Sequence, residues 1–164
     1  MACQEQGYLP KLVIELKCVW KNLEANDYSQ GRDYARTLEL DPLRVVLVNQ
    51  PPGSYELGQN RPAPPTTVHL VGDDKAVTWG TFEKEYPEGD DVELRRVVEE
   101  AIKELYDDWC IEQAGFQELD YQEVLREALV KNLDSKKYYV TMESQVLKGR
   151  GKKRSDHVIW LVPS

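Results

Sequence analysis

Two consecutive runs of apolar residues at helical spacing, between positions 90 and 133, constrain the fold of this chain more than any other feature. In the first run, Asp90 and Glu93 resemble a capping box. In the second run, Asp120 and Glu123 have the same spacing and again resemble a capping box. The apolar positions are Leu94, Val97, Val98, Ala101, Ile102, Leu105 and Trp109, followed by Val124, Leu125, Ala128, Leu129 and Leu133. Because the link around Gly115 is short, we expect two antiparallel helices that lie side by side.

An amphipathic helix pair needs a second apolar layer, and stretches with strand patterns supply it. These stretches alternate in polarity or are rich in β-branched residues, and they comprise residues 43–49, 67–71, 75–82, 137–144 and 157–162. Gly72-Asp73-Asp74 predicts a hairpin turn between the second and third of them. Residues 11–25 fit either a strand or a helix, and their Val, Ile and Trp content favours a strand at 11–21. The polar residues 26–32 predict a turn.

The length of 164 residues fits one domain that builds its own core. We expect a single α+β domain over residues 1–164, with a mostly antiparallel sheet and the two antiparallel helices packed on one face. Three segments lie outside this scheme: a tail at 1–10, a Pro-rich loop at 50–66 and a basic hairpin loop at 145–156. The prolines of the second segment exclude a central strand or helix there, because proline donates no backbone hydrogen bond.

Other properties of the sequence exclude several classes of protein. The longest apolar run, residues 158–162, is far shorter than the roughly 18 residues of a membrane span, and the first residues lack the pattern of a secretory signal. Three scattered cysteines, Cys3, Cys18 and Cys110, indicate a reduced, cytoplasmic protein rather than a disulfide framework.

Charge is unevenly distributed along the chain. The net charge is -8, yet residues 73–127 hold eighteen acidic and six basic residues, whereas residues 131–154 hold eight basic and two acidic ones. The basic excess is concentrated at Lys148, Arg150, Lys152, Lys153 and Arg154, a candidate site for a phosphate backbone or an acidic protein surface. An acidic docking face is predicted at Glu100, Glu104, Asp107 and Asp108.

Motifs for catalysis are weak. Glu15-Leu16-Lys17 resembles the E-x-K element of metal-dependent nucleases, in which the carboxylate binds Mg²⁺, but only Glu5 stands upstream as a further acidic ligand. The cysteines and the two histidines, His69 and His157, lack metal-site spacing. No phosphate-binding glycine loop occurs. We therefore predict no metal, no cofactor and no catalytic residue.

Three functions stay open. The first is a non-catalytic interaction protein, a regulator, inhibitor or adaptor that binds another protein through segregated acidic and basic surfaces. The second is a nucleic-acid-binding module that uses residues 148–154, and the third is a metal-dependent nuclease. The sequence does not determine the oligomeric state or the identity of the partner.

Overall fold

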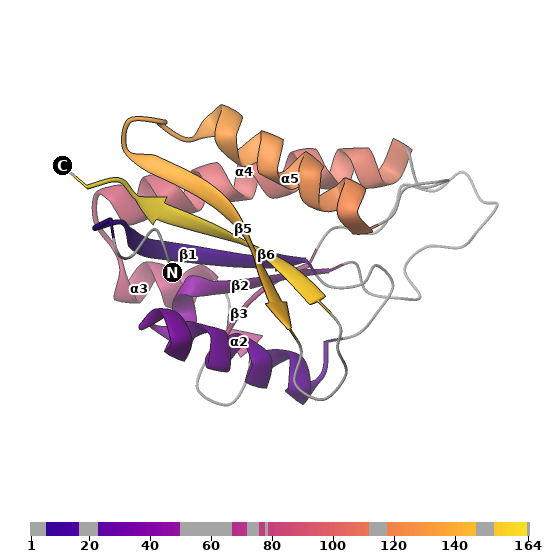
Figure 1. The fold of residues 1–164 in the computed structure, drawn as a ribbon, viewed down its shortest axis with the longest axis horizontal. Coiled ribbons are helices and arrows are strands. Elements are labelled where there is room, and N and C mark those ends of the chain that lie inside the picture. The colour runs from indigo at the N-terminus through magenta and orange to yellow at the C-terminus, as the bar shows by residue number, and fades with distance from the viewer. Residues whose placement is uncertain are drawn as a thin grey trace.

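The computed structural model describes residues 6–16, 23–49, 67–71, 76–77, 79–111, 118–146 and 153–163. They form an α+β fold in which helices lie on both sides of a sheet (Figure 1). The elements in chain order are β1 (Leu9–Leu16), α2 (Ala25–Leu38), the 3-10 helix η1 (Pro42–Arg44), β2 (Val45–Asn49), β3 (Thr67–Val71), β4 (Ala76–Val77), α3 (Trp79–Glu85), α4 (Asp90–Ile111), α5 (Glu118–Asn132), β5 (Tyr138–Val146) and β6 (Lys153–Leu161).

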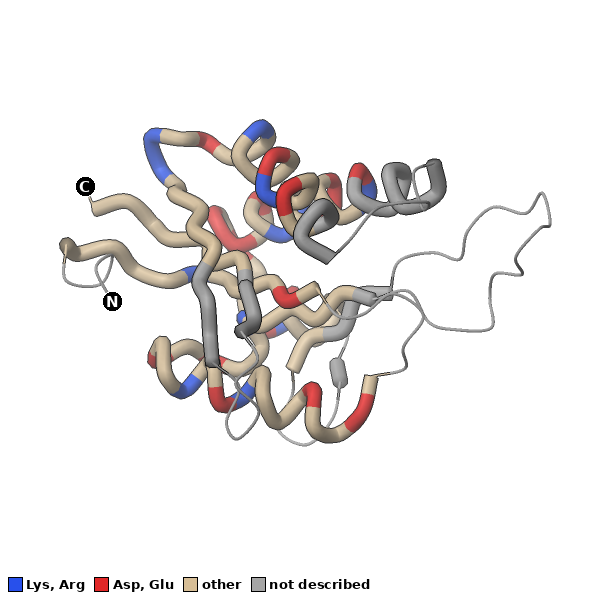
Figure 2. The backbone as a smooth tube through the Cα atoms, turned by 45° about the vertical axis from the view of Figure 1, so that its right-hand side comes forward, with Lys and Arg blue, Asp and Glu red and all other residues tan. Residues whose placement is uncertain are grey.

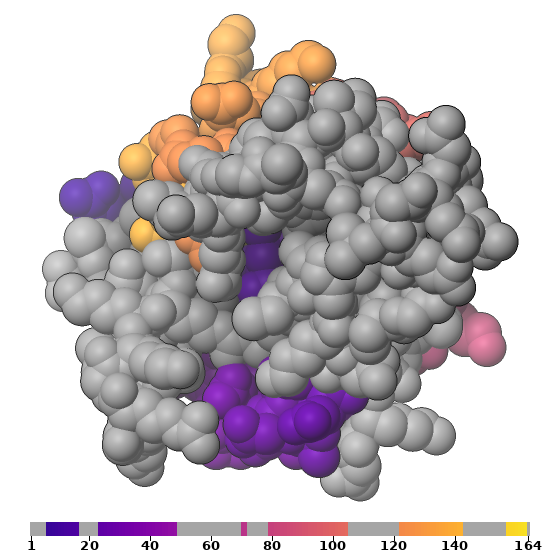
Figure 3. All heavy atoms as spheres, turned by 90° about the vertical axis from the view of Figure 1, so that its right-hand side faces the viewer, coloured from indigo at the N-terminus to yellow at the C-terminus, as the bar shows by residue number. Residues whose placement is uncertain are grey.

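The described strands form one mixed sheet with the order β4-β3-β2-β1-β6-β5. The central pair β1 and β2 is parallel, with Val13 opposite Val45, and α2 makes the crossover between them. The remaining neighbouring pairs are antiparallel, so the sheet is mostly antiparallel, as the sequence predicts. Figure 3 views the end at which β1 finishes, with α2 along the bottom and part of β1 visible at the centre.

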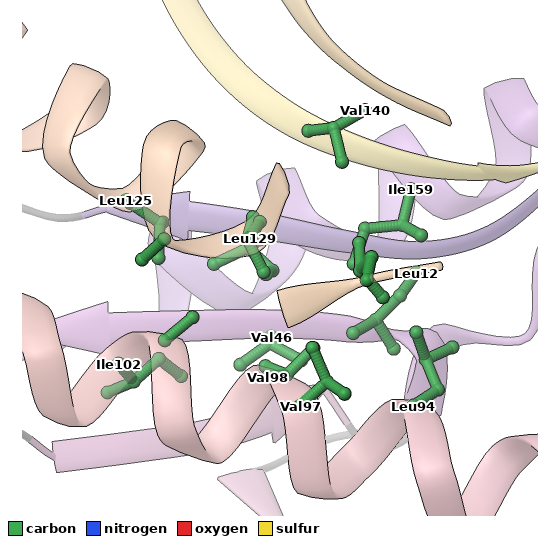
Figure 4. Packing of buried hydrophobic residues seen from close by; sticks show 14 of the residues in the cluster. Leu12, Val46, Leu94, Val97, Val98, Ile102, Leu125, Leu129, Val140 and Ile159 are labelled. Atoms are coloured by element: carbon green, nitrogen blue, oxygen red, sulfur yellow. The ribbon is translucent and has the colours of Figure 1, made fainter. Parts of the chain in front are cut away.

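The larger apolar core lies between the sheet and helices α3, α4 and α5. Leu12 of β1, Val46 of β2 and Ile159 of β6 belong to one buried cluster with residues of these helices. Figure 4 shows the helical members close to the strands: Leu94, Val97, Val98 and Ile102 from α4, and Leu125 and Leu129 from α5. The helical periodicity at 90–133 therefore identified this side of the core correctly.

A second, smaller core lies under α2 on the opposite face of the sheet. It joins Tyr34, Ala35 and Leu38 of the helix to Val13, Val45, Leu47, Val71, Val158 and Trp160 of the strands. Strands β1 and β2 are thus buried on both faces, which explains why their sequences are nearly continuous apolar runs.

The prediction of a turn at 26–32 is wrong, because these residues belong to α2. The helix begins with a capping box, in which the backbone N–H of Glu24 donates to the Asp27 carboxylate at 2.8 Å. Gly31, Tyr34, Ala35 and Leu38 are buried, at the i, i+3, i+4, i+7 spacing of a helix face. Position 31 requires a glycine because the helix lies close to the sheet, and not because the chain turns there. A Cβ added at Gly31 would lie 2.9 Å from Val71 Cγ2.

The strand predicted at 75–82 is also only partly correct. β3 and β4 pair antiparallel, as the hairpin predicts, but β4 spans only Ala76–Val77. Residues 79–85 form α3, whose Phe82 packs into the larger core. The alternation of polarity in this segment was too short to distinguish a strand from a single-face helix.

The strands β5 and β6 run farther than expected. Residues 145–146 and 153–156, assigned to the basic loop by the sequence, continue the ladder, with Gln145 opposite Arg154 and Val146 opposite Lys153. Polar residues extend the ladder because its hydrogen bonds are made by the backbone. Similarly, β1 begins at Leu9, inside the predicted tail. The Pro-rich segment 50–66 lies outside the described residues.

Candidate docking site

The basic residues singled out in the sequence are only partly placed. Lys148, Arg150 and Lys152 lie outside the described residues. Lys153 and Arg154 are the first two residues of β6, and the structure describes their backbone pairing but not their side chains. The basic site at 148–154 therefore stays a prediction.

The predicted acidic face is placed on α4, which contains all four of its residues. Glu100 is exposed, whereas Glu104 accepts a hydrogen bond from Lys131 of α5, with 3.4 Å between Oε1 and Nζ. Asp107 and Asp108 lie on the same helix, but their side chains are outside the described part of the chain. Figure 2 shows acidic and basic positions interspersed along α4 and α5, so the described part of this face carries its own counter-charges.

The E-x-K element is divided between described and undescribed residues. Glu15 lies on β1 with only 1% of its surface exposed, and Lys17 is outside the described ranges. Where the structure describes side chains, no group of three or more His, Cys, Asp or Glu residues is arranged to hold a metal ion. These residues give no support to the hypothesis of a metal-dependent nuclease.

A denser acidic surface occurs where α3 meets α4. Residues 83–93 hold six acidic residues and one basic residue, a balance of -5 within eleven positions. They are Glu83, Glu85, Glu88, Asp90, Asp91 and Glu93, with Lys84. Gly89 lies between the two helices and adopts the left-handed region at φ +58°, which glycine enters without steric cost. We call residues 83–93 the acidic corner.

The corner is fixed to the sheet by one arginine. Arg44, at the end of η1, donates from Nη1 to Asp91 Oδ1 at 2.9 Å and to the backbone carbonyl of Lys11 at 3.2 Å. Its guanidinium carbon lies 3.9 Å from the centre of the Tyr86 ring, a cation–π contact. The Tyr86 hydroxyl in turn donates to Asp41 Oδ2 at 2.8 Å. These contacts join η1, α3 and α4 into one unit.

The charge states of Arg44 and Tyr86 follow from their contacts. Burial alone lowers the pKa of Arg44, but the hydrogen bond and charge of Asp91 outweigh it, so that the pKa is raised. The pKa of Tyr86 is raised first by burial and then by its bond to the Asp41 carboxylate. Arg44 is therefore charged and Tyr86 neutral across the physiological range.

A small cavity of about 230 Å³ opens within the acidic corner. Its walls are mainly apolar. Phe82, Tyr86, Pro87 and Val92 contribute apolar surface, and Glu83, Asp91 and Arg95 contribute charged groups. Val92 is exposed over 49% of its surface. We call this cavity the corner pocket.

The positive charge of Arg95 at the pocket is compensated locally. Its guanidinium pairs with Glu83 of α3 and with Glu99 one turn along α4, the latter at 2.9 Å. It also lies 5.5 Å from the Trp79 ring, which packs edge-on against Phe82. The two carboxylates that line the pocket, Glu83 and Asp91, are thus paired with Arg95 and Arg44.

Sequence reasoning missed this site, although one signal was present. The sequence shows the acidic stretch 73–127 as a whole, but its densest part, 83–93, begins just after the strand predicted at 75–82 and ends in the helix start predicted at Asp90 and Glu93. The spacing of Asp90 and Glu93 predicts a capping box, and in the structure their side chains pair with Lys137 and Arg96. A count of charge in short windows would have located the corner. The pairing of Arg44 with Asp91, 47 positions apart, has no local signal.

No family model, no curated protein and no solved structure matches this chain, so its function has to be argued from its own residues. Among the described helices, none combines the length and apolar character required to cross a membrane.

Proposed function

We propose that the protein is a non-catalytic regulator, inhibitor or adaptor that binds a basic region of another protein through the acidic corner. The observation that carries this proposal is an apolar pocket, fixed by Arg44, in a segment where Glu85 and Glu88 are exposed. The other four carboxylates of residues 83–93 are paired with Arg44, Arg95, Arg96 and Lys137, so the excess negative charge of the corner comes from these two glutamates. A surface with an excess of charge of one sign attracts a partner surface of the opposite charge and orients it during encounter.

Stability alone is a weak reason for this concentration of carboxylates. Exposed ion pairs contribute only about 0–1 kcal/mol each, and Glu85 and Glu88 are exposed. The exposed Glu85 and Glu88 contribute negative charge that a basic partner can meet. This charge also disfavours nucleic acid at this place, because phosphates repel carboxylates.

The test is a charge reversal with a matched control. Glu85→Lys/Glu88→Lys reverses the acidic corner, and Glu123→Lys/Glu127→Lys makes the same change in charge at exposed positions on α5. Each immobilised protein is incubated with nuclease-treated native lysate at low salt, and retained proteins are eluted with salt and identified.

We expect the wild type and the α5 variant to retain a common set of proteins that the corner variant loses. Two results would contradict the proposal: an identical set on all three proteins, or metal-dependent hydrolysis of nucleic acid that Glu15→Gln abolishes. The nucleic-acid-binding alternative rests on residues 148–154 and is tested by changing Lys152, Lys153 and Arg154 to Glu in a filter-binding titration.

A further inference from the structure

The corner pocket is the right size for one side chain of a partner. Its volume of about 230 Å³ is below the roughly 300–1,000 Å³ of sites for small organic ligands. A single aliphatic side chain fits such a volume, whereas a nucleotide or a cofactor does not. The pocket therefore suits a residue that projects from a peptide segment.

The pocket is largely preformed. Phe82, buried to 99%, lies below it, and the Tyr86 ring is tilted against Phe82 with 4.9 Å between the ring centres. Tyr86 is held on its other side by Arg44 and at its hydroxyl by Asp41. Rigid aromatic walls reduce the entropy lost when a ligand binds, and buried pockets of this kind hold the side chains that dominate binding energy at protein interfaces.

The charge around the pocket specifies what flanks that side chain. Glu83 and Asp91 line the opening and are paired with Arg95 and Arg44, whereas Glu85 and Glu88 are exposed in the same acidic corner. Basic residues on either side of the inserted residue would be attracted by Glu85 and Glu88, whereas acidic neighbours would be repelled.

We propose that the corner pocket binds one aliphatic side chain from a protein segment in which that residue is flanked by Lys or Arg. This inference rests on the proposed function, and it adds the chemistry of the segment that binds. Charge brings the segment to the acidic corner, and burial of the apolar side chain holds it there.

The experiment uses two synthetic peptides of equal charge, acetyl-Gly-Lys-Lys-Leu-Lys-Lys-Gly-amide and the same peptide with Ser in place of Leu. Binding to the full chain is measured by calorimetry at low ionic strength. Val92→Phe narrows the pocket without a change in charge. Val130→Phe on α5 is the matched control, because Val130 is also 49% exposed and does not line the pocket. Thermal unfolding verifies that both variants are folded.

We expect the wild type and Val130→Phe to bind the Leu peptide at least about ten-fold more tightly than the Ser peptide, because the pocket removes the apolar Leu side chain from water and Ser has no such surface to bury. In Val92→Phe the two peptides should bind alike. Equal binding of both peptides to the wild type, or an unchanged preference in Val92→Phe, would overturn the inference and leave the proposed function standing. Failure of the wild type to bind either peptide would overturn both.

Discussion

His157 is fully buried on β6, beneath α5, and it is neutral in the folded protein. Its Nε2 lies 2.7 Å from the backbone carbonyl oxygen of Gln122, so Nε2 carries the proton and donates. Burial lowers the pKa of the imidazole more than this bond and the charge of Glu123 raise it, and Arg126 lowers it further. Below the ordinary histidine pKa of about 6.5, the unfolded chain therefore binds a proton that the folded chain does not.

This difference predicts a loss of stability in mild acid. The free energy of unfolding should fall as the pH drops below about 6.5, with a slope of at most about 1.4 kcal/mol per pH unit from this residue. His157→Gln keeps an N–H donor near Gln122 and removes the titration. Urea unfolding between pH 7.5 and 5.0 compares the two proteins, and the variant is expected to have the flatter profile. Parallel profiles would show that His157 does not contribute to the pH dependence.

Arg44 is the second residue whose contacts predict a measurable effect. Its side chain is only 11% exposed and that of Asp91 23%, so the pair is shielded from solvent more than the surface pairs on α4. Removing one partner of such a pair leaves the other charge poorly solvated. Arg44→Met should lower the free energy of unfolding by about 2–4 kcal/mol, through loss of the ion pair and of the cation–π contact with Tyr86.

A double-mutant cycle with Asp91→Asn separates these contributions. We expect a coupling energy of about 1–3 kcal/mol between positions 44 and 91, and none between Arg96 and Asp91 as a control. Additive effects at positions 44 and 91 would contradict the role of Arg44 in fixing the acidic corner.

At the level of elements, α2 depends on how closely it approaches the sheet. An added Cβ at Gly31 would lie 2.9 Å from Val71 Cγ2 and 3.4 Å from Val45 Cγ1, and both valines are buried. Gly31→Ala gains about 1 kcal/mol in helix propensity, but overpacking costs about 1–3 kcal/mol against stiff, β-branched neighbours.

We therefore expect Gly31→Ala to destabilise the protein by about 1 kcal/mol, measured by denaturant unfolding. Adding Val71→Ala makes room for the new methyl group, so the Gly31→Ala step should cost less in that background. A gain in stability from Gly31→Ala alone would mean that α2 is not held closely against the sheet.

The elements also differ in how far their sequences predict them. The apolar positions recur over about four turns in α4 and nearly three in α5, and the helices are found where the sequence predicts them. α2 was missed because its exposed positions are polar and Gly31 was read as a turn residue, although its buried positions have helical spacing. The apolar positions of α3 are too few to establish a period, and the contact of Arg44 with the acidic corner depends on the tertiary fold.

At the scale of the whole molecule, the sheet separates two surfaces of different character. One face is covered by α2, and the other by α3, α4 and α5, which include the acidic corner (Figure 1). The net charge of -8 makes encounter with a basic partner dependent on ionic strength. Binding that is driven by the acidic corner should weaken as salt is raised, mainly through a slower association rate.

Chemical-shift mapping locates the binding surface directly. Backbone amide shifts of the ¹⁵N-labelled protein are followed while the lysine-rich Leu peptide is added at low ionic strength. If the acidic corner is the docking site, the largest shifts occur within residues 79–96, and Glu85→Lys/Glu88→Lys abolishes them. Largest shifts on α2 or at the β5 edge, or no shifts at any peptide concentration, would contradict the assignment of this corner as the docking site.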